Sequence, residues 1–152
     1  MDHPLIREVL SLRLPADDFL VAGSGPLLAL GIRDDIGDVD VVARDKAWSR
    51  ALSLGTPGPA VFGGGVERVQ LLDGRIEILN EWFPEIWSVD DLIERSSVVD
   101  GVRYASLEDV YHWKRKLDRP KDRKDVILIE RYAREGRRPP CGPVTGGPSP
   151  SA

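Results

Sequence analysis

The sequence predicts one α+β domain, in which a small mixed β-sheet is flanked by helices. The first observation is length, because 152 residues, 41% of them hydrophobic, suffice to bury one core. The second is a set of short apolar or alternating runs, typical of strands, at 19–22, 38–42, 66–72 and 75–79. The third is helical periodicity after residue 106, which predicts a pair of helices at the carboxyl end.

Composition and charge exclude several classes of protein. The one cysteine, Cys141, rules out a disulfide framework and a cysteine-based zinc site. No signal pattern and no apolar run of membrane-spanning length is present, so we expect a cytoplasmic protein without membrane association. Residues 1–111 carry 10 basic and 20 acidic side chains, whereas residues 112–138 carry 11 and 5. Such a basic segment either attracts phosphates of a nucleotide or RNA, or is a solvated helix face.

The amino-terminal third predicts a turn suited to binding phosphate. A helix over 4–14 precedes the buried strand 19–22, which breaks at Gly23-Ser24-Gly25. A short apolar helix then runs from Pro26 to Leu30. Because the first amide groups of a helix have no partner within it, the turn at Gly23 and Ser24 could hold a phosphate.

The second strand, 38–42, predicts a metal site next to that turn. Side chains alternate along a strand, so Asp38 and Asp40 share one face while Val39 and Val41 point into the core. The two carboxylates, about 7 Å apart, repel each other unless a cation lies between them. Hard cations such as Mg²⁺ prefer oxygen ligands of this kind. A phosphate cradle beside two such carboxylates favours nucleoside triphosphate chemistry.

The middle of the chain adds a third carboxylate. A helix is expected over 44–54 and a glycine-rich loop over 55–65. The following two runs form a hairpin, since Asp73-Gly74 suits a tight turn with positive φ. In its second strand Glu77 lies between Ile76 and Ile78, a placement that costs stability unless a partner or metal compensates the charge. The alternative is an exposed strand glutamate.

The two carboxyl-terminal helices carry the basic residues. Ser106 is expected to cap the first helix, and Lys114 falls on its apolar stripe, where a lysine must pair or reach past the core edge. Arg119-Pro120 ends this helix and starts the second. The opening turns of the second helix contain Lys121, Asp122 and Asp125. By themselves, the two aspartates are also favourable there because of the helix dipole.

Together these motifs resemble a known family. Gly23-Ser24, thirteen intervening residues and Asp38-Val39-Asp40 resemble the signature of the nucleotidyltransferase superfamily related to DNA polymerase beta. Ile76-Glu77-Ile78 matches the third acidic position of that family. The run from Lys114 to Asp125 resembles the downstream motifs of minimal and AbiEii-like nucleotidyltransferases, which include toxins of toxin–antitoxin pairs. The resemblance covers residues 18 to about 133.

The resemblance implies an enzyme with the nucleotidyltransferase fold, whose carboxyl-terminal helix pair closes the nucleotide cleft. With Mg²⁺ or Mn²⁺ it would transfer a nucleoside monophosphate from a triphosphate to an acceptor hydroxyl of tRNA, a protein or a small molecule. The catalytic and metal-binding residues would be Asp38, Asp40 and Glu77. The nucleotide-binding residues would be Gly23, Ser24, Lys114, Lys121, Asp122 and Asp125. The resemblance also implies that the protein could be the toxin of a toxin–antitoxin pair, with a cognate antitoxin as its partner.

Two alternatives remain open. Gly23-x-Gly25 also suggests a dinucleotide-binding turn with Asp45 as the ribose ligand, but Leu28 replaces the third glycine and the Asp38–Asp40 pair stays unexplained. The other alternative is a non-catalytic antitoxin or interaction module with the same fold. We expect the domain to span residues 1–135 and the Pro/Gly/Ser-rich tail, 136–152, to be disordered.

Overall fold

A computed structural model describes residues 2–61 and 63–136 of the chain. These residues form a mixed α+β structure, as the sequence predicts. The helices are α1 (Pro4–Ser11), α2 (Gly25–Ala29), α3 (Asp45–Leu54), α4 (Val89–Arg95), α5 (Leu107–Leu117), α6 (Pro120–Arg134) and a 3-10 turn, η1 (Ala16–Asp18). The strands are β1 (Phe19–Ala22), β2 (Val39–Ala43), β3 (Gly58–Pro59), β4 (Glu67–Leu71), β5 (Ile76–Leu79), β6 (Ser97–Val99) and β7 (Val102–Tyr104). The expected tail lies outside the described residues, apart from Gly136.

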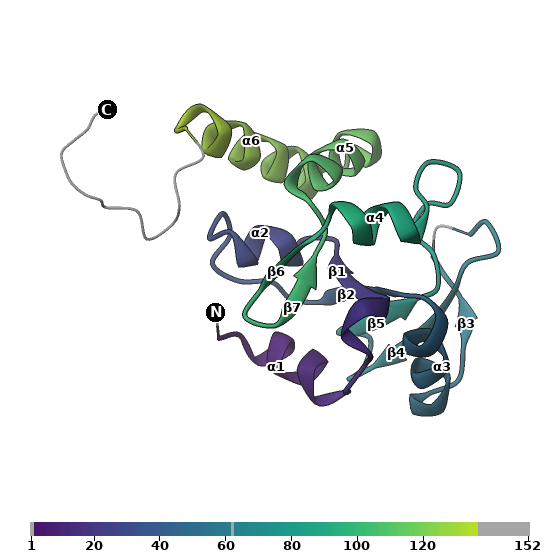
Figure 1. Ribbon diagram of the computed structural model, residues 1–152. Helices are drawn as coiled ribbons and strands as arrows, with labels where there is room; N and C mark the ends of the chain where they lie inside the picture. The colour runs from purple at the N-terminus through teal and green to yellow at the C-terminus, as the bar shows by residue number, and fades with distance from the viewer. Residues whose placement is uncertain (1, 62, 137–152) are drawn as a thin grey trace.

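All the described strands belong to one sheet in the order β3-β4-β5-β2-β1-β7-β6. The central pair, β1 and β2, is antiparallel, whereas β2 pairs with β5 and β1 with β7 in parallel. The outer pairs β4–β5, β3–β4 and β6–β7 are antiparallel. Figure 1 shows the strands gathered in the middle of the molecule, with α5 and α6 side by side above them. The sheet is therefore mixed, as expected.

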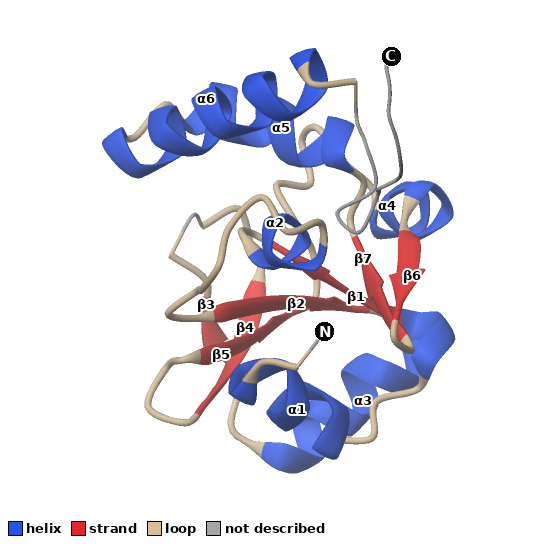
Figure 2. Cartoon of the chain, turned by 90° about the vertical axis from the view of Figure 1, so that its left-hand side faces the viewer, coloured by secondary structure: helices blue, strands red, loops and turns tan. Residues whose placement is uncertain are grey.

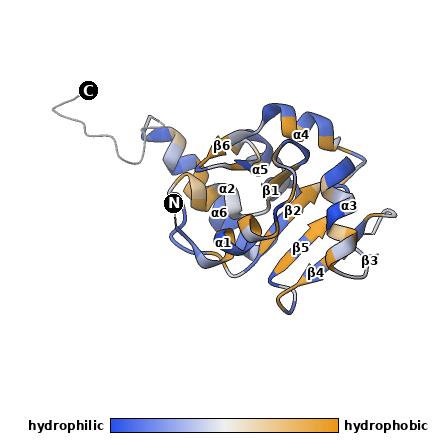
Figure 3. Cartoon of the chain, turned by 60° about the horizontal axis from the view of Figure 1, so that its bottom comes forward, coloured by the Kyte–Doolittle hydropathy of each residue, from blue (hydrophilic) through white to orange (hydrophobic). Residues whose placement is uncertain are grey.

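The helices form two layers, one on each face of the sheet. Figure 2 shows α1 and α3 below the sheet and α2, α5 and α6 above it. The lower core contains Val39, Val41, Ile76 and Ile78, which alternate inward from β2 and β5. The upper core contains Val42 and Leu79 together with the aromatic side chains Trp82, Trp87 and Trp113. Figure 3 shows β2 and β5 as strongly hydrophobic strands in the centre of the fold.

The aromatic segment that follows β5 anchors the upper helix layer. Trp82 and Trp87 each make an edge contact with Trp113 of α5, at centroid distances of 5.2 and 5.9 Å. Both indoles are 6% exposed, which leaves little surface for stacking on a base. They serve as core anchors, the more common role for such residues.

Most elements lie where the sequence places them, with small differences at their ends. The hairpin at Asp73-Gly74 is confirmed, and both residues have positive φ. The second strand begins at Val39, so Asp38 precedes it instead of belonging to it. The loop expected over 55–65 contains the short edge strand β3, which pairs with β4. None of the helices within the described residues is long and apolar enough to cross a membrane.

The topology is unlike that of a dinucleotide-binding domain. Such a domain needs a parallel strand–helix–strand unit with the glycine turn between the first strand and the helix. Here β1, α2 and β2 follow in that order, but β1 and β2 are antiparallel, with Ala22 opposite Asp40. The glycine turn after β1 therefore does not lie in a parallel strand–helix–strand unit, and the structure does not support the dinucleotide-binding interpretation.

Candidate functional site

A polar row crosses the upper face of the sheet through three neighbouring strands, β2, β5 and β4, next to Ala22 of β1. Ala22 of β1 lies opposite Asp40 of β2, Asp40 opposite Glu77 of β5, and Glu77 opposite Gln70 of β4. The side chains next to them on β2 and β5 point into the lower core, which fixes Asp40 and Glu77 on the upper face. Strand register thus brings together two of the three predicted carboxylates.

The glycine turn lies directly against Asp40. Gly23 follows β1 with φ +62°, in the left-handed region that favours glycine. A Cβ atom at this position would come within 2.5 Å of the Asp40 carboxylate oxygen Oδ2, so the carboxylate would have to move away from the turn. The absence of a side chain at Gly23 is therefore what leaves room for the Asp40 carboxylate beside the turn.

The environment of Asp40 disfavours its negative charge. Burial, together with the nearby charges of Asp38 and Glu77, raises the pKa of Asp40 from 3.8 to about 7. The positive charges of Lys114 and Lys121 act in the opposite direction but do not offset this increase. An additional positive charge next to Asp40 would therefore stabilise the ionised form of its carboxylate around neutral pH.

Glu77 has a basic partner on the neighbouring strand. The guanidinium Nη1 of Arg68 donates to Glu77 Oε2 at 2.7 Å, and the Gln70 amide donates to the same oxygen at 3.2 Å. The side chains of Arg68 and Glu77 are 21% and 22% exposed. The negative charge of Glu77, which the sequence predicted to need a partner or a metal, is thus paired with Arg68.

Lys114 lies in a buried network that joins α5, α6 and the glycine turn. Its ammonium contacts Asp125 Oδ2 at 2.8 Å and Asp122 Oδ1 at 3.6 Å, and donates to the Ser24 hydroxyl at 3.0 Å. The Lys114 side chain is 4% exposed. Arg33 also approaches Asp125, at 3.5 Å. Of the two possibilities expected for this lysine, pairing or reaching past the core edge, the structure shows pairing. Its partners are three of the other predicted site residues.

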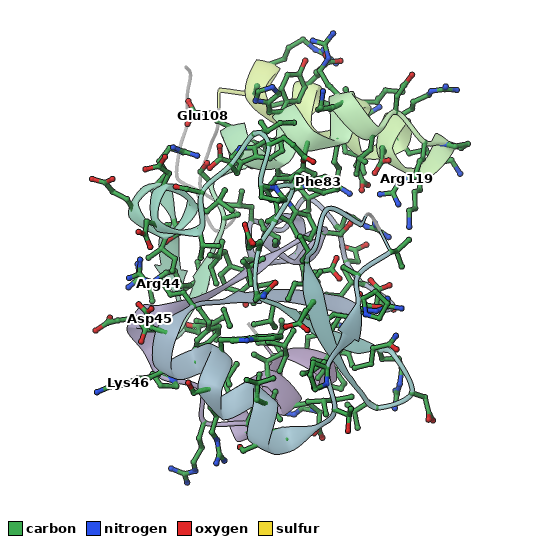
Figure 4. All side chains as sticks on the ribbon, turned by 90° about the vertical axis from the view of Figure 1, so that its right-hand side faces the viewer. Arg44, Asp45, Lys46, Phe83, Glu108 and Arg119 are labelled. Atoms are coloured by element: carbon green, nitrogen blue, oxygen red, sulfur yellow. The ribbon has the colours of Figure 1, made fainter. Side chains whose placement is uncertain are left out.

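Asp122 links this network to Arg119, the residue before α6. Its carboxylate accepts hydrogen bonds from the Arg119 backbone amide at 3.1 Å and from the guanidinium Nε at 2.6 Å. Burial alone would raise the pKa of the Asp122 carboxyl. The hydrogen bonds from Arg119 and the charges of Arg119 and Lys114 outweigh burial, so the pKa of Asp122 is lowered. Figure 4 shows Arg119 at the underside of the helix pair, across the molecule from Arg44.

Arg119 belongs to the basic side of the site. Its bond to Asp122 raises the pKa of Arg119, and the charges of Asp40 and Asp38 raise it further. Its side chain is 50% exposed, whereas that of Lys114 is covered. Arg119 therefore presents an accessible positive charge to the carboxylates.

The predicted residues form two groups, with the Gly23-Ser24 turn touching both. One group is the acidic row with Asp40 and Glu77, and the other is the Lys114 network. Asp38 and Lys121 are exposed at the margin of the site. Within 2–61 and 63–136 no three histidine, cysteine or acidic residues form a cluster of metal-binding geometry.

Two basic residues of the site, Arg68 and Arg119, were not among the residues predicted from the sequence. Arg119 lies within the family-like run but received no role there. Arg68 could have been found from the hairpin, because a two-residue turn at Asp73-Gly74 places Gln70 opposite Glu77 and Arg68 on the same face.

A cavity of about 820 Å³ lies elsewhere, next to the edge of the sheet formed by β6 and β7. It is lined by α2, β6, β7, the start of α5 and the second half of α6. None of the predicted site residues lines it. This cavity is therefore separate from the predicted site residues.

Comparisons with protein-family models, with curated proteins and with solved structures found no match to this chain. The geometry described above is the basis of the functional proposal.

Proposed function

We propose that the protein is a divalent-metal-dependent nucleotidyltransferase that moves a nucleoside monophosphate from a triphosphate to an acceptor hydroxyl. The observation that carries the proposal is the register of the central strands, which puts Asp40 and Glu77 side by side under a glycine turn. Carboxylates, an open turn and basic side chains on the facing helices are the parts that phosphoryl transfer chemistry requires.

The residues present fit a hard divalent cation. Asp38, Asp40 and Glu77 offer only oxygen donors, which Mg²⁺ and Mn²⁺ prefer. Gly23 leaves the space next to Asp40 Oδ2 free of a side chain. When bound by these residues, the cation would offset the charge of the triphosphate and of the transferring phosphoryl group.

The chain's own groups would bind and orient the nucleotide. The turn at Gly23-Ser24 would receive the phosphates, with the Ser24 hydroxyl held in place by Lys114. The exposed charges of Arg119 and Lys121 would attract the triphosphate toward the acidic row. Asp122 and Asp125 would act indirectly, because they fix Lys114 and Arg119.

Glu77 would serve as the general base. Its carboxylate would accept the proton of the acceptor hydroxyl as the acceptor oxygen attacks the α-phosphorus and pyrophosphate leaves. The basic segment at the carboxyl end makes tRNA a suitable acceptor, which agrees with a toxin role in the cytoplasm. A protein hydroxyl and a small-molecule hydroxyl are the other acceptors to be tested.

A labelling experiment tests the proposal. The protein is incubated with each α-³²P-labelled nucleoside triphosphate, Mg²⁺ and, separately, total RNA, cellular protein or aminoglycosides. We expect label to enter one acceptor fraction with release of pyrophosphate, and excess chelator or Asp40→Asn to abolish it. Transfer that persists in chelator would refute the metal dependence. Metal-dependent triphosphate binding without transfer to any acceptor would indicate a non-catalytic module with this fold, such as an antitoxin.

A further inference from the structure

The ion pair between Arg68 and Glu77 is positioned to control access to the acidic row. Arg68 lies on β4 with its side chain on the upper face, because its neighbour Val69 faces the lower core. Its guanidinium reaches diagonally across to Glu77, at 2.7 Å. Glu77 is the direct neighbour of Asp40 in the parallel pair β2–β5. A positive charge thus lies at the carboxylate that would complete the metal site.

One carboxylate oxygen of Glu77 carries both contacts. Arg68 and Gln70 each donate to Oε2. Lone pairs that accept two N–H donors do not at the same time coordinate a hard cation, and a guanidinium next to a divalent ion adds repulsion between like charges. Arg68 and a metal ion therefore compete for Glu77, because only Oε1 is left to a cation while Arg68 and Gln70 hold Oε2.

We infer that Arg68 is a positioning residue that holds Glu77 while the site is free of metal and competes with the divalent cation for this carboxylate. The inference rests on the proposed function, because it takes the acidic row as a metal site. It adds to the proposed function that the affinity of the site for metal depends on Arg68, a residue outside the family-like motifs. A cation that binds Oε2 of Glu77 displaces Arg68, whose guanidinium then remains on the upper face as a further positive charge for a phosphate.

A purely structural role for the pair leads to different expectations. A partly exposed cross-strand ion pair stabilises a fold only slightly. Its removal would lower stability slightly and leave metal affinity unchanged. Competition predicts the opposite pattern, in which the variant without the arginine binds metal more tightly.

The test is a Mn²⁺ titration of the full chain, with free Mn²⁺ measured by electron paramagnetic resonance. The variants are Arg68→Gln, Glu77→Gln, the double variant, and Arg75→Gln as the matched control. Arg75 directly precedes β5 and donates to the Leu72 carbonyl instead of to Glu77. We expect Arg68→Gln to bind Mn²⁺ about tenfold more tightly than the wild type, corresponding to about 1.4 kcal/mol. In the Glu77→Gln background the same substitution should change affinity little, because the competing pair is already absent.

Each outcome has a distinct meaning. Equal Mn²⁺ affinity of the wild type and Arg68→Gln would overturn the inference while leaving the metal site intact. An equal gain in Arg75→Gln would also overturn it, since diffuse charge would then explain the effect. No Mn²⁺ binding by any variant would overturn both the inference and the metal site. Arg68→Lys, which keeps the charge and volume, guards against misfolding of Arg68→Gln and should give an affinity between those of the wild type and Arg68→Gln.

Discussion

Lys114 gives the sharpest mutational prediction, because its ammonium lies between two buried carboxylates. We consider Lys114→Met, which keeps most of the side chain's volume and removes the charge. Asp125 and Asp122, with side chains 4% and 0% exposed, would lose a cation at 2.8 and 3.6 Å. Asp122 keeps its bonds to Arg119, whereas Asp125 keeps only the longer contacts to Arg33 and Ser24.

The magnitude follows from the burial of the pair. Removing one partner of a buried ion pair destabilises a protein by about 3–5 kcal/mol, because the remaining charge stays desolvated and unpaired. At about 2–4 °C per kcal/mol for a chain of this size, the melting temperature should fall by about 6–20 °C. Triphosphate binding, measured well below that temperature, should weaken by about tenfold to a hundredfold, because Ser24 also loses the donor that orients its hydroxyl.

Lys116→Met is the control, since Lys116 is exposed on another face of the same helix. It should change stability by no more than about 0.5 kcal/mol. Adding Asp125→Asn to Lys114→Met should recover part of the lost stability, because the unpaired charge is then removed. Thermal unfolding monitored by circular dichroism checks all three. Equal melting temperatures for Lys114→Met and Lys116→Met would refute the buried network.

Two further predictions concern Asp40 and its turn. Gly23→Ala should destabilise the fold by about 1–3 kcal/mol and abolish Mn²⁺ binding, because its Cβ would meet Asp40 Oδ2 at 2.5 Å. Gly101→Ala, also at positive φ but with open space around it, is the control and should leave Mn²⁺ affinity unchanged. For pH, a folded-state pKa of about 7 against 3.8 means that the folded protein holds a proton that the unfolded chain has released. This contribution to stability is complete below about pH 4 and disappears as pH rises through 7, a loss of up to about 4 kcal/mol. Urea unfolding of the metal-free protein at about pH 5 and pH 8 should show the loss in the wild type and not in Asp40→Asn, and parallel pH profiles would contradict it.

The face of the sheet on which Asp40 and Glu77 each lie could be predicted from the sequence, because it depends on local rules. Asp40 and Glu77 are each flanked by core residues on a strand, so alternation alone puts them on the face opposite that core. The Asp73-Gly74 turn fixed the register of β4 and β5. The place of Lys114 on an apolar stripe predicted that its ammonium would either pair or reach past the core edge, and the structure shows the pairing.

The remaining features depend on long-range packing. Nothing local shows that β2 pairs with β5 in parallel, with β1 on its other side, although this order makes Asp40 and Glu77 neighbours. The contact of Lys114 with Ser24 joins residues 90 positions apart, and it arises only when α5 packs near the turn after β1. Asp122 and Asp125 looked equally suited to the helix dipole, and only their burial beside Lys114 gives them a specific role.

Calorimetric titration with a non-reactive triphosphate tests the central claim most directly, because it does not depend on the acceptor. Wild type and Asp40→Asn are titrated with α,β-methylene analogues of the four nucleoside triphosphates, with Mg²⁺ and with chelator. The wild type should bind at least one analogue in Mg²⁺ only, and Asp40→Asn should bind none while keeping its fold. Binding of equal strength in chelator, equal binding by Asp40→Asn, or no binding by the wild type would contradict a metal-dependent nucleotide site on this face of the sheet.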